Sequence, residues 1–290
     1  MERIRIVGVP EHFNFPWVET IKQQPFRDRR LELVWEDESR GSGAMNKAIR
    51  NGDADIALIL TESFVKDRVE GNPGKIIGFH VLSPLIWGIH VPAGAGVTGV
   101  SDLERIPFLV SRMGSGSHLM AYLFAKQQNW PADGLAFETV NNLDGAMKAF
   151  ESGKPQAFLW EKYTTKPLVD RGLFERLGEI PTPWPCFVIV ASETALANYG
   201  NEIKAIRDFA YHKSKSCMDN VGSTIREISK NYQLREEDVA AWFSQTVWAT
   251  NEDVSKADLS VTLDILQELS LIKQKIHLEE LVAEDFVNLI

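Results

Sequence analysis

The chain has 290 residues, of which 44% are hydrophobic and 24% charged, and its formal net charge at pH 7 is −9. These proportions exclude an intrinsically disordered chain, because enough apolar side chain is present to form a core, and the acidic excess argues against a nucleic-acid partner. Two cysteines exclude a disulfide scaffold and a cysteine-rich zinc site, and no apolar run approaches the roughly 18 residues that predict a membrane-spanning helix.

Short apolar strands alternate with amphipathic helices in the first part of the chain. Strands are predicted at 4–9, 31–35, 55–60, 76–82 and 86–91, and helices at 17–24, 42–50 and 63–69. Asn51-Gly52 is a typical helix stop, and Gly71-Asn72-Pro73-Gly74 is a typical turn. This alternation predicts a parallel sheet covered by helices.

A second alternating unit begins after the turn-rich segment 92–96. Strands are predicted at 107–111, 136–140, 157–160 and 186–191, and helices at 118–128, 143–151, 163–170, 195–230, 236–243 and 254–271. No clear strand follows Ser192, and such a helical tail needs a surface to cover. We therefore predict an α/β fold in which residues 1–92 and 185–290 form one lobe and residues 93–184 the other, joined by two crossings, with a cleft between them.

The segment from Ser111 to His118 lies between a predicted strand and a predicted helix and reads Ser-Arg-Met-Gly-Ser-Gly-Ser-His. Small residues let a ligand approach the backbone, and the first amides of a helix are unpaired at its positive end. This combination predicts an anion site for phosphate, sulfonate or carboxylate, with Arg112 as a bidentate clamp. The pattern is neither a Walker motif nor a dinucleotide fingerprint, and an ordinary Gly/Ser helix start is the alternative.

Polar and aromatic residues also follow the other predicted strands. Each is by itself a common cap or turn residue, but open α/β sheets bind ligands at the carboxyl ends of their strands. The predicted ligand contacts are His12, Phe13, Asn14, Trp17, Arg40, Ser42, Thr61, Glu62, Ser63, Ser83, Arg112, Gly114, Ser115, Gly116, Ser117, His118, Asn141, Trp160, Glu161 and Tyr163. For the residues from His12 to Trp17, hydrophobic packing is an equally good interpretation.

Catalysis remains open at this stage. His118 is the best acid–base candidate, with Glu62 and Glu161 as its acidic partners, and a helix N-terminus favours neutral imidazole. No two histidines have the spacing of a zincin, so no metal site is predicted. No nucleophile elbow surrounds Ser115 or Ser117, so a serine nucleophile is not indicated, and no cofactor is predicted.

Four parts of the chain share the pattern of one family: Val100-Ser101-Asp102-Leu103 with Pro107 to His118, Asn51 to Ala57, Leu85 to Pro92, and Leu143 to Phe150 with Gly153 and Ala157 to Trp160. Together they resemble the type II periplasmic substrate-binding proteins, and within them the sulfonate, taurine, nitrate and thiamine-precursor group. The resemblance covers essentially the whole chain. It implies two α/β lobes that close on a small ligand, contacted by residues 12–14, 40–42, 61–63, 83, 115–118, 141 and 160–163.

The first hypothesis is a binding protein for a small anionic organic metabolite, either as the substrate-binding protein of an ABC transporter or as a cytoplasmic relative. If exported, its partners are a permease and an ATPase subunit. A cytoplasmic lyase or synthase that uses His118 is the second hypothesis. Assembly through exposed tail aromatics such as Trp242 and Trp248 is the third, although core packing is the better interpretation of both tryptophans. No leader precedes the first strand, so the chain as written is predicted to be cytoplasmic, or periplasmic if a native leader was removed.

Overall fold

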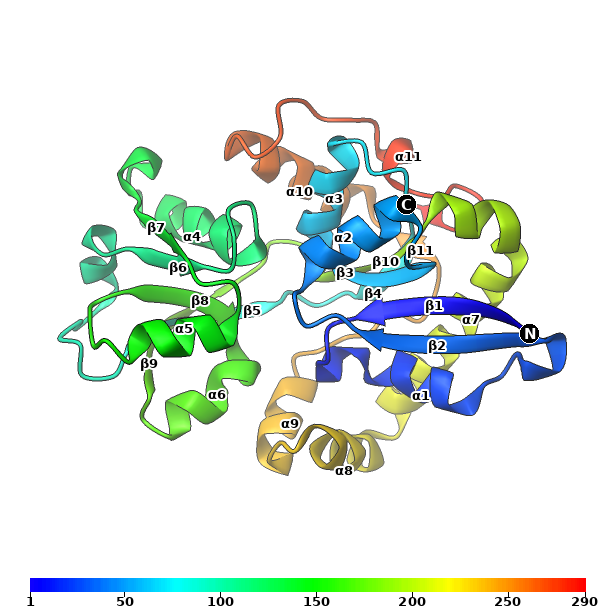
Figure 1. Cartoon of the computed structure of the whole chain (residues 1–290), viewed down its shortest axis with the longest axis horizontal. Coiled ribbons are helices and arrows are strands. Elements are labelled where there is room, and N and C mark those ends of the chain that lie inside the picture. The colour runs from blue at the N-terminus through cyan, green and yellow to red at the C-terminus, as the bar shows by residue number, and fades with distance from the viewer. The chain divides into compact units, whose positions relative to one another are not determined.

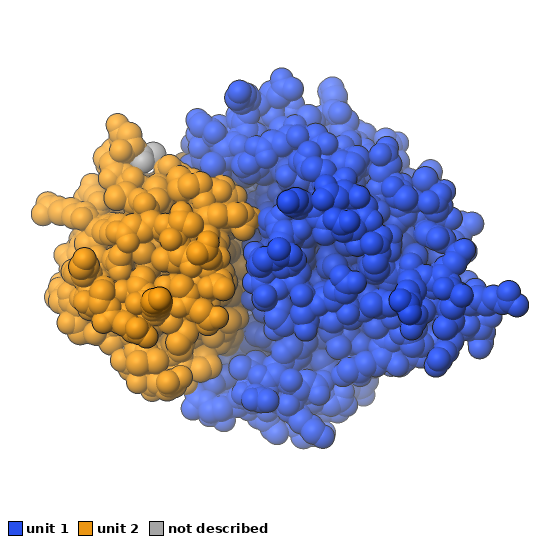
Figure 2. Space-filling model, in the orientation of Figure 1, with its two compact units in different colours: residues 1–84, 183–290 blue, residues 85–182 orange. Residues whose placement is uncertain are grey.

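The computed structural model describes residues 1–131 and 133–290 and divides into two compact units (Figures 1 and 2). Unit 1 comprises Met1–Pro84 and Pro183–Ile290, and unit 2 comprises Leu85–Thr182. The sequence analysis instead assigns residues up to 92 to the first lobe. The strand β5 (Ile86–Pro92) lies in unit 2 because it pairs with the strands β8 (Ala157–Glu161) and β9 (Phe174–Pro181) there.

Unit 1 is built on a five-stranded sheet of order β2-β1-β3-β10-β4. Its strands are β1 (Glu2–Gly8), β2 (Leu31–Asp37), β3 (Ile56–Leu60), β4 (Lys75–Val81) and β10 (Phe187–Ala191). β1 runs parallel to β2 and β3, and Ile6 lies opposite both Trp35 and Ile56. The prediction of a parallel sheet is confirmed for β1, β2 and β3, whereas β10, which returns from unit 2, is antiparallel to its neighbours β3 and β4, so the sheet is mixed.

Helices cover both faces of this sheet (Figure 1). Those before the chain leaves unit 1 are η1 (His12–Asn14), α1 (Phe15–Gln23), η2 (Arg27–Arg29), α2 (Ser42–Asn51) and α3 (Thr61–Val69). The returning segment forms α7 (Glu193–Asp219), α8 (Val221–Tyr232), α9 (Glu236–Phe243), α10 (Lys256–Glu268) and α11 (Leu278–Leu281). α1 and α7 pack together on one face, and α2 and α3 pack together on the other.

The tail differs from its prediction in two respects. The helix predicted over 195–230 is interrupted twice, because the backbone leaves helical geometry at Tyr199 (φ −135°, ψ 27°), which kinks α7, and at Asn220 (φ −117°, ψ 52°), which separates α7 from α8. The tail also contains two short strands, β11 (Asp253–Val254) and β12 (Asn288–Leu289), which pair in parallel, so the expectation of no strand after Ser192 is wrong. Two-residue strands carry no detectable sequence periodicity.

Buried polar contacts fix the tail helix α7 to the first sheet. Arg207, which is 1% exposed, donates to the carbonyl of Ile77 at 2.8 Å and to the carbonyl of Phe286. Tyr211 donates its hydroxyl to the carbonyl of Phe79 at 2.9 Å. Gly78 between these carbonyls has φ 152°, and a Cβ there would lie 2.0 Å from the Tyr211 hydroxyl oxygen, so only glycine allows this approach.

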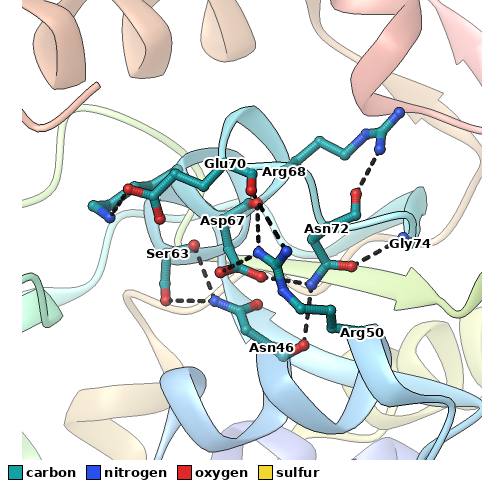
Figure 3. A network of polar contacts seen from close by, with 9 residues as sticks. Asn46, Arg50, Ser63, Asp67, Arg68, Glu70, Asn72 and Gly74 are labelled. Atoms are coloured by element: carbon teal, nitrogen blue, oxygen red, sulfur yellow. Dashed lines mark hydrogen bonds and ion pairs between the residues drawn. The ribbon is translucent and has the colours of Figure 1, made fainter. Parts of the chain in front are cut away.

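A second polar network joins α2, α3 and the turn before β4 (Figure 3). The side-chain amide of Asn72, fully buried, donates to the carbonyl of Asn46 and the carboxylate of Asp67, and its carbonyl accepts from the amide of Gly74. Arg50 forms an ion pair with Asp67 at 2.9 Å. Because every contact lies within unit 1 and the contacts of Asn72 satisfy a buried side chain, this network is structural.

Unit 2 has a second mixed sheet, of order β7-β6-β8-β5-β9. Its remaining strands are β6 (Phe108–Val110) and β7 (Phe137–Thr139), and its helices are η3 (Val100–Arg105), α4 (Gly116–Gln127), α5 (Leu143–Phe150) and α6 (Lys162–Asp170). β6 is parallel to β7 and β8, whereas β5 is antiparallel to β8 and β9. The sequence analysis misses β9, an edge strand whose charged and half-exposed residues mask the period of two. Phe150, Phe158 and Phe174 form part of the hydrophobic core of unit 2.

Candidate functional site

In unit 2 the predicted contact residues gather at one edge of the sheet. The central strand β6 is parallel to both β7 and β8, so the carboxyl ends of all three strands lie at the same edge of the sheet. The helices α4, α5 and α6 follow β6, β7 and β8, respectively. The residues carried there are Arg112, Gly114, Ser115, Gly116, Ser117, His118, Asn141, Trp160, Glu161 and Tyr163. This arrangement is the one at which open α/β sheets hold ligands.

The loop before α4 is held by its own serine side chains. Ser115 is the N-cap of α4, and its hydroxyl accepts from the amide of His118 at 3.4 Å. The hydroxyl of Ser117 accepts from the amide of Ser111 at 3.0 Å and lies 3.0 Å from the hydroxyl of Ser115. Gly114 has φ 77°, a conformation that requires glycine in this turn. The predicted Gly/Ser helix start therefore adopts one defined, hydrogen-bonded shape.

Two backbone donors at the start of α4 have no partner within the described part of the chain. Among the described residues, no hydrogen bond is formed by the amides of Gly116 and Ser117, whereas the amide of Ser115 donates to the carbonyl of Arg112 at 3.1 Å. Both free amides belong to the first turn of a 12-residue helix, where the positive end of the helix dipole lies. Gly116 is half-exposed, so a ligand has access to this turn.

The start of α5 is shaped by the backbone before it. Asn141 is exposed and has φ 69°, a left-handed conformation that asparagine tolerates better than most residues. Asn142 caps α5 by accepting from the amide of Gly145 at 3.0 Å. A Cβ on Gly145 would lie 1.7 Å from the carbonyl oxygen of Val140, so this turn depends on glycine. Asn141 thus stays available at the same edge as the α4 loop.

The predicted contact residues at the end of β8 and the start of α6 form contacts within unit 2. Glu161 caps α6, accepting from the amide of Thr164 at 2.6 Å and from its hydroxyl at 2.8 Å, and burial raises the pKa of the carboxyl. Trp160 stacks on Phe158 with ring centroids 5.2 Å apart, and Tyr163 is buried. A helix cap and core packing account for these positions structurally.

In unit 1 the predicted contacts also follow parallel strand ends, but most are buried. His12 packs edge-on against Trp242 of α9, with ring centroids 4.2 Å apart, and burial lowers the pKa of its imidazole to about 3. Asn14 donates to the carbonyl of Val9 at 2.8 Å, and its side-chain oxygen lies 3.2 Å from Nε2 of His80. Phe13 and Trp17, like His12 and Asn14, are at most 3% exposed, which agrees with the packing interpretation for this segment.

Hydroxyls at the other strand ends of unit 1 bind backbone groups. Ser42 accepts from the amide of Leu60, Thr61 donates to the carbonyl of Pro185, and Ser83 accepts from the amide of Val247. The hydroxyl of Ser63 accepts from the side-chain amide of Asn46 at 3.1 Å. Arg40 is exposed and binds the neighbouring Glu38.

Glu62 is the most perturbed carboxyl of unit 1. It is 2% exposed, and one oxygen accepts from the indole nitrogen of Trp184 at 2.9 Å while Oε1 has no partner among the described residues. Burial raises the pKa of Glu62 to about 7. The three predicted catalytic residues are thus distributed over both units, with Glu62 in unit 1 and His118 and Glu161 in unit 2.

Two further features complete the inventory of unit 1. A groove of about 450 Å³ lies beside the ends of β1 and β2, and no predicted contact residue lines it. It is lined by Val9, Pro10, Val18, Lys22, Trp35, Asp37, Asn231 and Tyr232. Trp242 and Trp248 are each 1% exposed, which confirms their interpretation as core residues and removes the sequence support for assembly through them.

The described residues contain neither a metal-binding cluster nor a membrane-spanning helix. Within the described residues, no group of three or more His, Cys, Asp or Glu side chains has a geometry that would hold a metal ion. No helix in the described part of the chain combines the length and the apolar character that crossing a bilayer requires.

Comparison with known proteins supports the resemblance seen in the sequence. Residues 87–180, nearly all of unit 2, match the sequence model of the Ca3427-like PBP family. The CA3427 gene product of Candida albicans, described as having the generic periplasmic binding protein fold, superposes with a TM-score of 0.89 and 24% identity over 100% of this chain and 98% of its own. The fold is that of the type II periplasmic binding proteins.

Two other solved proteins that superpose on the chain are sulfonate-binding proteins. The alkanesulfonate-binding protein SsuA of Xanthomonas axonopodis pv. citri, bound to MOPS, is 13% identical with a TM-score of 0.79, covering 100% of this chain and 99% of its own. The aliphatic sulphonate-binding protein SsuA of Escherichia coli is 14% identical with a TM-score of 0.75, covering 99% of each chain. No curated protein sequence matches the chain. The periplasmic-binding-protein fold is established by these superpositions.

Proposed function

We propose that the protein binds a small organic anion, a sulfonate, phosphate or carboxylate, and that the acidic group sits at the first turn of α4. The observation that carries the proposal is the pair of unpartnered amides of Gly116 and Ser117 in a half-exposed helix start. Two aligned N–H groups at a helix N-terminus form a ready anion site. Fold similarity to the two sulfonate-binding proteins adds support by analogy.

The neighbouring groups fit the same ligand class. The hydroxyls of Ser111, Ser115 and Ser117 line the same loop, and Asn141 lies at the same sheet edge with an exposed side chain. Arg112, which is half-buried at the start of the loop, supplies the positive charge. The ligand is therefore proposed to have a compact acidic head and an organic remainder. If the protein acts in transport, its partners are a permease and an ATPase subunit.

The first experiment is a thermal-shift panel of aliphatic sulfonates, phosphonates, phosphates and carboxylates, followed by mass spectrometry of each mixture. A ligand that binds only the folded state at 100 times its Kd adds about 2.7 kcal/mol of stability, which raises the Tm measurably. A Tm increase with the compound recovered intact supports a binding protein. Consumption of the compound would instead support the enzyme of the second hypothesis.

A single substitution tests the position of the site. Gly116 is outside the left-handed region, so Gly116→Leu is compatible with the helix backbone and places a side chain over the free amides. We expect at least tenfold weaker binding with an unchanged Tm of the unliganded protein. Gly222→Leu, at an exposed position in the first turn of α8, is the matched control. Equal affinity of Gly116→Leu and wild type would refute the proposed site.

A further inference from the structure

His118 makes one side-chain hydrogen bond that determines its protonation state. The backbone amide of Gly114 donates to Nδ1 of His118 at 3.0 Å, so Nδ1 carries no proton and the neutral ring carries its proton on Nε2. Nε2 is buried and has no partner among the described residues. The ring packs edge-on against Tyr122 and Phe137, at centroid distances of 4.8 Å and 4.6 Å. These contacts hold the imidazole in one orientation.

The same bond holds the loop. Gly114 has φ 77°, and its amide is fixed by His118, while the next amide, of Ser115, is fixed by the carbonyl of Arg112. The two free amides of Gly116 and Ser117 follow directly. An imidazolium would carry a proton on Nδ1 facing the N–H of Gly114, and two donors cannot share one hydrogen bond. The loop geometry therefore requires neutral His118.

We infer that His118 is a positioning residue, which orients the amides of Gly116 and Ser117 through the Gly114 peptide and releases them when Nδ1 is protonated. This inference rests on the proposed function, because it concerns the anion site at α4. It assigns His118 no proton transfer to a ligand. Anion affinity should then decrease on acidification, although the net charge of the protein becomes more positive.

We assign the expected acid dependence of anion affinity to the titration of His118 itself. Burial lowers the pKa of His118. The charged or titratable groups on the elements packed around it are Tyr122 and Lys126 of α4, Arg112 of the loop, Asp133 of the turn after α4, Glu138 of β7, and Glu161 of β8, whose carboxylate caps α6. The carboxylate of Glu138 binds the side-chain amide of Gln156 at 2.8 Å, and β7 presents the apolar ring of Phe137 to His118.

The test measures the Kd of methanesulfonate by calorimetry from pH 8 to pH 4.5, a range in which the charge of this probe is constant. For the wild type we expect affinity to fall by up to tenfold for each pH unit below the pKa of His118. The oxygen of Asn occupies nearly the place of Nδ1 and accepts the Gly114 amide without titrating. His118→Asn should therefore bind within about threefold of wild type at pH 8 and lose the acid dependence.

The second variant separates positioning from bulk. His118→Gln places its polar end near Nε2 rather than Nδ1, so we expect about tenfold weaker binding at every pH. Affinity of wild type that rises on acidification would show attraction by an imidazolium and overturn the inference. Equal affinities of wild type, Asn and Gln variants would overturn it too, while leaving the anion site in place.

A ligand-free measurement distinguishes failure of the inference from failure of the proposed function. Hydrogen exchange of the Gly114 amide, followed by NMR, should be slow in wild type and His118→Asn and at least tenfold faster in His118→Gln. Protection of this kind without methanesulfonate binding would reject the proposed site while supporting the loop contact. Equal exchange in all three proteins would reject the positioning role.

Discussion

The loop after β1 in unit 1, Val9–Asn14, and the loop after β6 in unit 2, Ser111–Ser115, occupy equivalent places at the carboxyl ends of parallel strands. Both are rich in polar residues, but they differ in what remains available. In the first, His12 packs on Trp242 and Asn14 binds Val9 and His80. In the second, the serines bind one another and leave two backbone amides free.

The difference comes from what covers each loop. Tyr232 of α8 and Trp242 of α9, contributed by the tail, both contact the ring of His12. The loop in unit 2 is followed immediately by α4, whose own first turn defines the free donors. A polar residue at a strand end is therefore a binding candidate only where no other element of its own unit closes over it.

The largest expected effect on stability concerns Glu62. Burial raises the pKa of Glu62 to about 7 from its ordinary value of 4.5. Below pH 4.5 both the folded and the unfolded carboxyl are protonated. Between pH 4.5 and 7 the unfolded carboxyl loses its proton first, so the free energy of unfolding falls as pH rises, by about 3 kcal/mol in total. Glu62→Gln removes this dependence and keeps an acceptor for Trp184.

Urea unfolding of the full-length protein at several pH values measures this effect. The free energy of unfolding of wild type relative to Glu62→Gln should fall by about 3 kcal/mol between pH 4.5 and 7. Glu227→Gln, on the exposed face of α8, is the matched control, and its pH profile should be the same as that of the wild type. Parallel profiles for wild type and Glu62→Gln would show that Glu62 ionises freely in the folded protein, and the assignment of a buried neutral carboxyl would be wrong.

An effect of opposite sign is expected for His12, and at pH 5 it is smaller than the total effect of Glu62. Burial lowers its pKa to about 3 from 6.5, so the unfolded imidazole is protonated first as the pH falls. The free energy of unfolding therefore decreases from pH 6.5 downwards, by about 2 kcal/mol at pH 5. His12→Phe cannot titrate and should lose this dependence. It should also leave methanesulfonate affinity unchanged, because His12 belongs to the core of unit 1.

This variant tests the comparison between the two loops directly. Chemical unfolding at pH 7 and pH 5 gives the stability difference, and calorimetry gives the affinity. A loss of anion affinity in His12→Phe, with the stability at pH 7 retained, would mean that the loop after β1 contacts the ligand, and the contrast between the two units would fail.

The sequence predicts the elements better than their environments. The segment Ser111–His118 is recognisable because strand, small residues and helix are adjacent in the chain, so local rules apply to it. The burial of His12 depends on Trp242, and the antiparallel direction of β10 depends on the path of the chain through unit 2. Local periodicity in the sequence predicts neither the burial of His12 nor the direction of β10. β9 is missed because an edge strand with exposed charges lacks a clear alternation.

The sequence predicts unpaired amides at this helix start, but it does not predict that Gly116 and Ser117 are the two that stay without a partner among the described residues. Any helix start leaves such donors, and whether a side chain or backbone group satisfies them is decided by the fold. The role of His118 follows the same logic. Its place beside the glycines suggests acid–base chemistry, but the bond from the Gly114 amide to Nδ1 shows that the ring faces the loop backbone.

The smallest effect compares two helix caps of the same type, one in each unit. Ser115 caps α4 by accepting from the amide of His118, and Ser192 caps α7 by accepting from the amide of Ala195 at 3.2 Å. Replacement by alanine should lower the free energy of unfolding of the affected unit by about 1 kcal/mol in each case. Only Ser115→Ala should also weaken methanesulfonate binding, since its hydroxyl orders the loop with the free amides. Weaker binding in Ser192→Ala, measured by calorimetry at pH 8, would show that affinity follows helix stability in general and that the start of α4 has no special part in it.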